Sequence, residues 1–373
     1  MARGKIFSAR VEGIAAGGAG IARLDGKSVF IDFTAAGDMA SFRIEKDHKK
    51  WAEAELLEVL EPSPDRVRAA CPHYGVCGGC SLQHINYAAQ IKAKAAILGD
   101  AFKRIGGINP PEIKVYESEP FGYRNRVQLH RAENGGLGFR ERKSPRIAAI
   151  EDCPVAEKGI REALKKGSLA AVGKARFAVY SRGDTFLHEG GKERGKVRIL
   201  DREIAMDAGL FFQSNAAMLE RLISDLGAAA GRADNRLPLA DLYCGVGIFA
   251  SFLGGRPGPG FPEIALFEES RAALSLAREN MPEGKKLEFH ARKDSEWIAA
   301  IKNREYGFMV LDPPRLGLCR QLRDCLAECG PALAAYVSCD PATLARDSRA
   351  LLDGGYALEE LAMYDFYPQT AHI

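Results

Sequence analysis

The chain lacks the sequence features of membrane-spanning and secreted proteins. None of its 373 residues belongs to an apolar run of eighteen or more, and the N-terminus lacks the apolar stretch of a signal peptide. Internal repeats and low-complexity tracts are also missing. We therefore expect a cytoplasmic globular protein without membrane contact, long enough for two or three domains.

The chain as a whole has no large excess of either charge sign, since its formal net charge is only +3. The charges are unevenly distributed, however. Residues 1–70 carry 11 Lys/Arg and 11 Asp/Glu, residues 91–210 carry 24 and 16, and residues 211–373 carry 17 and 22. The basic middle segment indicates a polyanionic partner, and a solvated basic face without a partner is the alternative.

Nine cysteines in a cytoplasmic chain are not expected to form a disulfide framework. Four of them are candidate metal ligands, because four thiolates suit structural zinc as well as a [4Fe–4S] cluster. These four are Cys71, Cys77 and Cys80, in a C-x5-C-x2-C pattern, and Cys153. We interpret the others outside the C-terminal Cys339 as packing residues: Cys244, Cys319, Cys325 and Cys329.

Residues 1–60 contain five short alternating segments separated by turn residues such as Gly17-Gly18 and Asp25-Gly26. This pattern predicts a small β-barrel of the OB type, which ends at the proline-rich linker that begins with Glu61. Such barrels often bind RNA, although the balanced charge also permits a structural role.

Residues 61–205 are predicted to form a central α+β domain. It begins with the cysteine cluster, continues with a helix over 84–105, and contains an antiparallel sheet with strands near 126–130 and 174–180.

Residues 206–373 are predicted to form a doubly wound parallel sheet, typical of Rossmann-like α/β domains. Four apolar strands alternate with helical stretches, and they lie at 237–242, 264–267, 308–311 and 334–337.

The loop after the first of these strands has the pattern of a nucleotide-type cofactor site. Gly245-x-Gly247 leads into a helix that begins near Ile248, and Glu268 ends the next strand 21 residues after Gly247. Small residues let the backbone approach a ligand, and an acidic residue at this distance commonly binds ribose hydroxyls. Either a dinucleotide or S-adenosylmethionine fits this pattern.

Two further motifs follow strands of the same sheet. Asp312-Pro313-Pro314 ends the third strand and resembles a motif of nucleic-acid methyltransferases, with Arg315 where an aromatic residue would indicate an exocyclic amine as the target. Cys339 follows the fourth strand, directly before a helix start in which backbone N–H groups favour a thiolate. A buried core cysteine is the alternative, but a nucleophile and a cofactor loop in one sheet indicate an enzyme.

Taken together, residues 241–249, 312–315, 338–347 and 366–372 resemble the RNA 5-methyluridine methyltransferase family. The cysteine pattern followed by residues 81–84 is similar to the iron–sulfur branch of that family, and the first sixty residues are similar to its TRAM barrel. The resemblance favours a [4Fe–4S] cluster over zinc.

The resemblance implies methyl transfer from S-adenosylmethionine to C5 of a uridine in 23S ribosomal RNA. Cys339 would add covalently to uracil C6, and Asp312 would act beside it, either on the cofactor or on the target uracil. The implied cofactor-binding residues are Gln213, Tyr243, Gly245, Glu268, Asp294 and Asp312. Because the base must be extruded, a loop or bulge uridine is the expected target.

The sequence departs from the family pattern at two points. Ile248 occupies a position that is commonly Asn, so one cofactor contact is expected to be lost. The family's proton-abstracting glutamate would follow His372, whereas the sequence stops at Ile373. One hypothesis is that the sequence is a C-terminally incomplete version of a longer protein. The rival hypothesis is that His372 or Asp312 is the base.

Two other functions stay open, namely methylation of transfer RNA and RNA binding without catalysis. Residues 123–126 and 140–143 are the candidate contacts to the RNA backbone. The protein is expected to act as a monomer.

Overall fold

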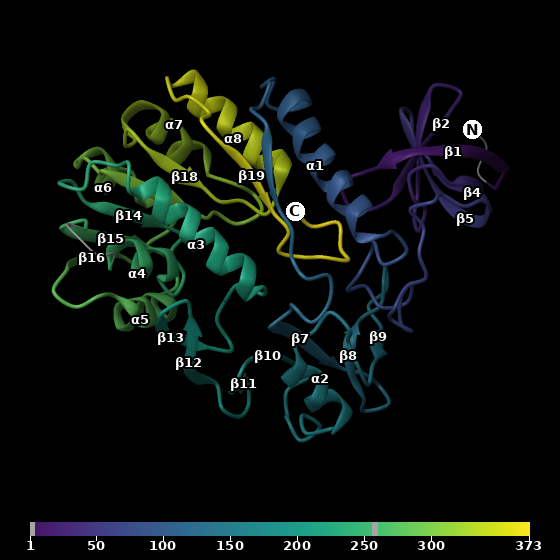
Figure 1. Cartoon of the computed structure of the whole chain (residues 1–373), viewed down its shortest axis with the longest axis horizontal. Helices are drawn as coiled ribbons and strands as arrows, with labels where there is room; N and C mark the ends of the chain where they lie inside the picture. The colour runs from purple at the N-terminus through teal and green to yellow at the C-terminus, as the bar shows by residue number, and fades with distance from the viewer. Residues whose placement is uncertain (1–3, 256–259) are drawn as a thin grey trace.

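The computed structural model describes residues 4–255 and 260–373 as three lobes that meet near the C-terminus (Figure 1). Five strands form a closed barrel in the order β1-β2-β3-β5-β4, which confirms the prediction for this segment. Residues 1–3 of the predicted barrel domain lie outside the described residues. The strands are β1 Ile6–Ile14, β2 Gly20–Leu24, β3 Lys27–Ile31, β4 Met39–Asp47 and β5 Trp51–Glu61.

The central lobe is an antiparallel sheet with the order β11-β10-β7-β8-β9 and one covering helix, α2. The predicted strands near 126–130 and 174–180 are confirmed as β7 and β10, which pair directly. Alternate residues of β7 and β10, such as Val127 and Phe177, pack against Ile160 of α2. The elements are β7 Arg126–Arg131, β8 Leu137–Arg140, β9 Ile147–Ala149, α2 Lys158–Lys165, β10 Arg176–Arg182 and β11 Thr185–His188.

The third lobe contains a five-stranded sheet in the order β16-β15-β14-β17-β18, and every adjacent pair is parallel. This confirms the predicted doubly wound sheet. The strands are β14 Leu239–Leu242, β15 Glu263–Phe267, β16 Lys286–His290, β17 Phe308–Leu311 and β18 Ala334–Tyr336.

Helices cover both faces of the parallel sheet because successive side chains point to opposite sides. Leu239 and Ile264 pack against α3, α4 and α5, whereas Ala240 and Ala265 pack against α6 and α7. The helices are α3 Ala216–Ala230, α4 Ile248–Gly254, α5 Arg271–Asn280, α6 Ile298–Lys302, α7 Arg320–Cys329 and α8 Pro341–Asp353.

Three features were not predicted from the sequence. Edge strand β16 is mostly polar and half-buried, so it lacks the apolar run of the other strands. The hairpin of β12 Arg194–Ile199 and β13 Arg202–Asp207 links the central sheet to the parallel sheet, and β6 Ile113–Tyr116 pairs in parallel with β19 Leu361–Tyr364.

The cysteines interpreted as packing residues have different environments. Cys244 and Cys325 are buried in the two cores of the parallel sheet, and Cys319 is half-buried. Cys329 is exposed on α7, with its Sγ 3.6 Å from that of Cys325, so the interpretation is wrong for this residue.

The predicted helix over 84–105 is confirmed as α1 Tyr87–Arg104, which lies beside α8 and β19 (Figure 1). Its Lys94 donates a 2.6 Å hydrogen bond to Asp365, and both side chains are at most 1% exposed. Tyr87 donates to the same carboxylate, and Gln90 exchanges hydrogen bonds with Gln369. Helix α1 therefore fixes the segment after β19.

No helix within residues 4–255 and 260–373 is long and apolar enough to cross a membrane. The division of the chain into domains 1–60, 61–205 and 206–373 stays a prediction.

Replacing Lys94 with Met is expected to destabilise the protein by about 3–5 kcal/mol, because Asp365 would remain buried without its cationic partner. Urea unfolding checks this value. Lys92→Met is the matched control, since Lys92 is exposed on the same helix and its loss should change stability by less than about 0.5 kcal/mol. Equal stability of the two variants would contradict the structural role of the ion pair.

Candidate active site

The loop between β14 and α4 turns sharply at the carboxyl end of the sheet. Tyr243, Gly245 and Gly247 all have positive φ angles, of 60°, 55° and 75°. A Cβ atom on Gly247 would lie 2.8 Å from Met281 and 3.0 Å from the Ala277 Cβ, so a side chain there would collide with α5 and its C-terminal end. The glycines thus let the loop pass close to α5 while Gly245 faces the cavity.

Glu268 stabilises this loop from the end of β15. One of its carboxylate oxygens accepts from the Gly245 backbone N–H at 3.1 Å, and the other accepts from the Ser270 N–H at 2.8 Å. The carboxylate also lines the cavity. Since each carboxylate oxygen has a further acceptor site, Glu268 can hold the loop and bind a hydroxyl at the same time.

Tyr243 and Asp294 form one wall of the cavity. The Tyr243 hydroxyl donates a 2.9 Å hydrogen bond to Asp294, and its ring packs edge-on against Trp297 with the centroids 4.8 Å apart. On another wall the Gln213 amide has no hydrogen-bond partner among the described residues, and the neighbouring Phe211 is 62% exposed. The Gln213 amide is therefore available to a ligand.

Two aspartates lie at the ends of adjacent strands β14 and β17. Asp241 is fully buried and accepts from the Ala250 N–H at 2.9 Å, which ties β14 to α4. Burial raises its pKa to about 8, and the carboxyls of Asp312 and Glu268 add to the shift. Burial also raises the pKa of Asp312, which lines the cavity, to about 7.

Cys339 lies between β18 and α8, as the sequence predicts. Asp340 caps α8 by accepting from the Ala342 and Thr343 N–H groups, and Pro341 is the first helical residue. The pKa of the Cys339 thiol is nevertheless raised, which corrects the expectation that the helix end alone favours the thiolate. Cys339 is exposed within the open cavity, yet partial desolvation by the surrounding atoms is the main cause of the raised pKa. Arg315 opposes this effect, and Asp312 adds to it.

Arg315 connects the thiol to the segment after β19. Besides its contact with Cys339, its guanidinium lies 3.1 Å from Nδ1 of His372. Burial, together with Arg315 and Arg124, lowers the pKa of His372 to about 4, so the imidazole is neutral at neutral pH. Arg124 lies above the Tyr367 ring at 5.7 Å.

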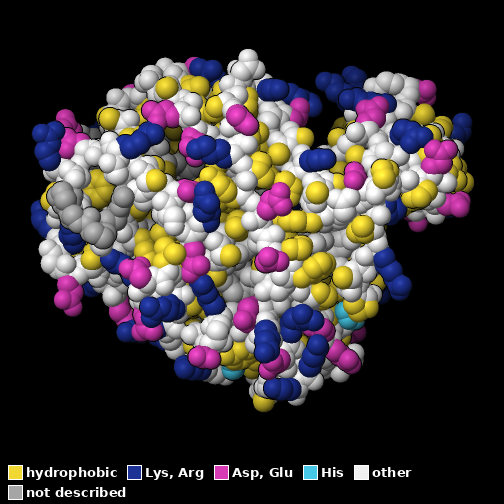
Figure 2. All heavy atoms as spheres, viewed as in Figure 1, with side chains coloured by type: hydrophobic (Ala, Val, Ile, Leu, Met, Phe, Trp, Pro, Cys, Tyr) yellow, Lys and Arg dark blue, Asp and Glu magenta, His cyan; other side chains and the backbone are white. Residues whose placement is uncertain are grey.

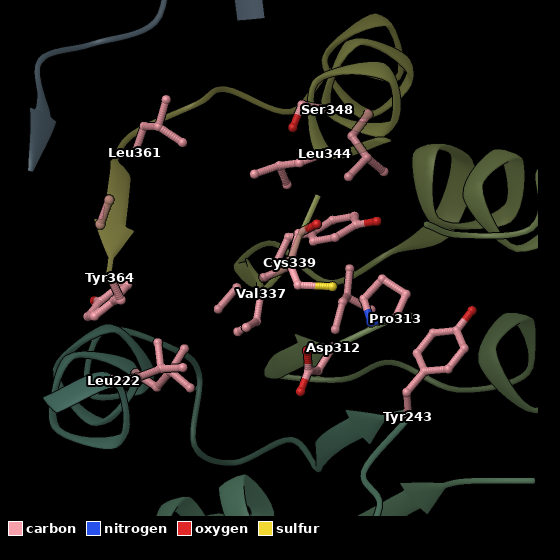
Figure 3. Close-up of a pocket in the computed structure, with 18 of the residues that line it drawn as sticks. Leu222, Tyr243, Asp312, Pro313, Val337, Cys339, Leu344, Ser348, Leu361 and Tyr364 are labelled. Atoms are coloured by element: carbon pink, nitrogen blue, oxygen red, sulfur yellow. The ribbon is translucent and has the colours of Figure 1, made fainter. Parts of the chain in front are cut away.

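These residues line one open cavity of about 1780 Å³. It brings together Cys339 and all the residues predicted to bind the cofactor, namely Gln213, Tyr243, Gly245, Glu268, Asp294 and Asp312. Figure 3 shows Cys339, Asp312, Pro313 and Tyr243 on one side, and the apolar side chains of Leu222 and Leu361 on the other. The cavity therefore has a polar part next to the thiol and an apolar part between α3, α8 and β19.

The four candidate metal ligands lie near one another. Cys71 and Cys77 raise the pKa of Cys80, and Cys80 raises that of Cys153, after burial as the main cause. However, no three His, Cys, Asp or Glu side chains of the described residues converge into a group that could hold a metal ion.

The candidate RNA contacts differ from the prediction in part. Arg142 and Lys143 both pair with Asp32 of the barrel, and Arg142 also covers the Phe33 ring at 4.8 Å. Tyr123 is buried and donates to the Pro368 carbonyl. Tyr123 and Arg142 therefore connect parts of the protein, which argues against a role as surface contacts, whereas the Lys143 side chain is still 64% exposed.

Ile248, the departure from the family pattern, is buried at 7% exposure in the core formed by α3, α4 and α5. Sequence reasoning assigned no role to Arg315 beside the thiol or to Arg124 in the cavity wall. The position of Arg315 directly after Pro314 could have indicated that it lies near the site. Arg124, by contrast, reaches the cavity only through tertiary packing.

A parallel sheet with a glycine loop and an acidic residue at its carboxyl end defines a Rossmann-like nucleotide-binding fold. The family model described as tRNA (Uracil-5-)-methyltransferase matches residues 181–373, and the TRAM domain model matches residues 2–57. The chain belongs to the tRNA (uracil-5-)-methyltransferase family and carries an N-terminal TRAM domain.

Related proteins resemble the chain along almost its whole length. An uncharacterized RNA methyltransferase of Treponema denticola is 32% identical over 94% of this chain and 92% of its own length. A protein of Alkalilimnicola ehrlichii named 23S rRNA (uracil(1939)-C(5))-methyltransferase RlmD is 29% identical over 98% and 95%. The Pyrococcus abyssi tRNA (uracil-54, C5)-methyltransferase in complex with S-adenosyl-L-homocysteine is 25% identical, with a TM-score of 0.75 over 98% of both chains.

Replacing Arg315 with Gln is expected to slow alkylation of Cys339 at neutral pH. Arg315 lowers the thiol pKa, so its loss raises that pKa and shifts the alkylation profile to higher pH. The rates should converge in strongly alkaline solution. Mass spectrometry of the Cys339 peptide after iodoacetamide treatment measures the rates. Arg320→Gln, at an exposed arginine, should leave the profile unchanged, and an unshifted profile for Arg315→Gln would exclude this role.

Proposed function

We propose that this protein transfers a methyl group from S-adenosylmethionine to C5 of a uridine in 23S ribosomal RNA. The observation that carries the proposal is the single cavity that contains Cys339, Asp312 and the predicted cofactor-binding residues. Relatives from Alkalilimnicola ehrlichii and Methylococcus capsulatus, named as 23S rRNA (uracil(1939)-C(5))-methyltransferases, support the choice of substrate.

The residues around the cofactor cavity suit the parts of S-adenosylmethionine. Glu268 would bind the ribose hydroxyls, Asp294 and Tyr243 would lie at the adenine, and Gln213 would supply its unpartnered amide. When bound, the cofactor supplies an electrophilic methyl group. The loop of Gly245 brings backbone rather than a side chain to the ligand.

Cys339 solves the chemical difficulty of the reaction, which is that uracil C5 is a poor nucleophile. The thiolate would add to C6, forming an S–C6 bond and making C5 an enolate carbon. That carbon could then attack the methyl group, whose bond to the cofactor sulfur would break as S-adenosylhomocysteine leaves. A base would then remove the C5 proton, and the electrons of that C–H bond would restore the C5–C6 double bond and expel the thiolate. Arg315 favours the anionic form of the thiol at the start and the end of this cycle.

Asp312 is the better of the two candidate bases within the described residues. Its pKa of about 7 makes a carboxylate available at neutral pH with substantial affinity for a proton. His372, with its pKa lowered to about 4, holds a proton weakly. Asp312 could also bind the uracil while protonated, because a neutral carboxyl can donate a hydrogen bond.

Transfer RNA is the second candidate substrate. The fold shared with the Pyrococcus abyssi tRNA (uracil-54, C5)-methyltransferase favours it, at a TM-score of 0.75. RNA binding without catalysis remains the non-enzymatic alternative from the sequence, and the intact cavity around Cys339 argues against it.

We also propose that Cys71, Cys77, Cys80 and Cys153 hold a [4Fe–4S] cluster, with zinc as the alternative. Their donor chemistry fits a soft metal group, and their mutual electrostatic influence indicates that they share one small region. Among the described residues the four sulfur atoms do not converge into a group that could hold a metal ion, so the proposal depends on the chemistry of the four thiols.

RNA that contains 5-fluorouridine is expected to trap the protein as a covalent adduct in the presence of S-adenosylmethionine. Fluorine at C5 cannot leave as a cation, so elimination of Cys339 is blocked whichever group is the base. A denaturation-resistant protein–RNA band should form with 23S rRNA and be lost in Cys339→Ala. Cys329→Ala, at an exposed cysteine of α7 that does not line the cavity, is the control. A band with transfer RNA alone would favour the second substrate, and no band with either RNA would exclude the mechanism.

Anaerobically purified protein is expected to contain about four iron and four sulfide per chain, as a [4Fe–4S] cluster requires. Cys80→Ser should lose this content, and Cys329→Ser, at an exposed cysteine outside the set, should retain it. Elemental analysis and the visible absorbance spectrum measure the content without reference to activity. Zinc in place of iron would support the alternative, and metal content unaffected by Cys80→Ser would contradict this ligand set.

A further inference from the structure

One face of the central sheet carries a row of polar side chains, two of them arginines, that leads away from the cavity. Arg124 precedes β7 and lines the cavity, and Arg126, Gln128 and His130 follow at every second position. Because alternate residues of a strand share a face, the last three lie on one side of the sheet, and Arg124 continues their alternation of half-buried residues. The residues between them, such as Val127 and Leu129, are buried against α2 on the opposite side.

Neighbouring strands add two more arginines to this face. Arg176 of β10 pairs directly with His130, and His130 also pairs with Gly138, two residues before Arg140 on β8. Directly paired residues point to the same side of a sheet. The pKa of His130 agrees with this placement, since after burial it is lowered by Arg140 and Arg176. We define the arginine face as Arg124, Arg126, Gln128, His130, Arg140 and Arg176.

The arginines of this face have no acidic partners, unlike most of their neighbours. Arg142, Arg146, Arg161 and Arg182 of the same lobe all form ion pairs. Among the described residues, no carboxylate lies within 4 Å of the guanidinium groups of the arginine face. Their hydrogen bonds go instead to neutral groups, as in the bonds of Arg176 to the Gln128 side chain and of Arg126 to the Ala208 carbonyl. Glu189 lies near Arg126 but is engaged by Lys174 and the Ala178 N–H.

The position of the face relative to the cavity indicates what it binds. Arg124 is its inner end, above Tyr367 and beside His372, whereas Arg140 and Arg176 are exposed at its outer end. A polyanionic strand that places one of its units in the cavity must continue over the surface next to the cavity. The row of arginines without ion pairs begins at the cavity wall and is therefore such a surface. The exposed guanidinium groups of Arg140 and Arg176 suit phosphate oxygens, which accept bidentate hydrogen bonds, whereas Nε of Arg126 is buried in the face.

We propose that the arginine face binds the phosphodiester backbone of the RNA strand that flanks the target uridine. This inference rests on the proposed function for the identity of the RNA. It centres the RNA surface of the central lobe on one side of one sheet, because Arg142 is held against Asp32 and Phe33 of the barrel. Arg124 would hold the phosphate nearest the extruded base, and Arg140 and Arg176 would hold phosphates further along the strand.

The test compares a double variant at the outer end of the face with a double variant of equal charge change elsewhere. Arg140→Gln/Arg176→Gln removes two exposed cations of the face, and Lys196→Gln/Arg198→Gln removes two exposed cations of β12. The probe is a 23S rRNA transcript made in vitro, bound at several salt concentrations. Both pairs are solvent-exposed, so both variants should fold, which circular dichroism checks.

The face variant is expected to bind the transcript about tenfold more weakly at moderate salt, and its salt slope should fall by about 1.4, as two lost phosphate contacts to single-stranded RNA require. The control should keep the affinity and slope of the unaltered protein. At saturating 5-fluorouridine transcript, the face variant should still form the Cys339 adduct, because the cavity is unchanged.

Equal affinity and slope for the face variant and the control would overturn the proposal, as would failure of the unaltered protein to bind the transcript at low salt. The absence of an adduct in the unaltered protein would instead contradict the proposed function. The salt-slope comparison would still decide whether the face binds RNA, because it measures binding alone.

Discussion

The buried ion pair between Lys94 and Asp365 is the interaction on which the candidate site depends. It joins the middle of α1 to the segment after β19, and both charged groups are removed from water. Tyr87 and Gln90 of the same helix bind Asp365 and Gln369, so one helix face holds the segment that carries Tyr367 and His372 to the cavity. A buried pair of this kind fixes geometry more than it adds stability, since desolvation opposes its Coulomb attraction.

Burial raises the pKa of both proposed reactive groups of the cavity, but only the thiol has a cation beside it. Enclosure at the end of β17 raises the proton affinity of Asp312, and Asp241 behind it is protonated more easily still. The thiol of Cys339 is next to Arg315, which counteracts part of the same effect. An acid whose pKa is near neutrality and a thiol beside a cation are two requirements of addition and elimination chemistry at uracil.

Much of this architecture could be predicted from local sequence. The barrel, helix α1 and four strands of the parallel sheet all follow from periodicity and turn residues. The residues Gly245, Glu268, Asp312 and Cys339 were identifiable because each lies within three residues after the end of a parallel strand. Strand β16 was missed because its residues are half-exposed and polar. The pairing of β6 with β19 was missed because its partners are 248 residues apart at Ile113 and Leu361, and no local pattern encodes such a contact.

Side-chain partners were the least predictable part. Residues 140–143 form one basic run in the sequence, but their side chains have different surroundings in the structure. Arg142 pairs with Asp32 of the barrel, whereas Arg140 is exposed on the sheet. The direction of the Cys339 pKa was also missed, because the helix end is a local feature whereas the enclosing wall is assembled from several lobes.

The long sequence separation within the ion pair has a consequence for the protein during its synthesis. Asp365 follows Lys94 by 271 residues, so at 5–20 residues per second the ribosome adds it about 14–54 s later. During that interval Lys94 cannot form its ion pair with Asp365, and α1 cannot pack against β19. The barrel and the central sheet can fold early, but the cavity lacks the wall formed by the segment after β19 until that segment has been synthesised. A ribosome-bound chain that has not yet reached this segment therefore has no Tyr367 or His372 in its cavity.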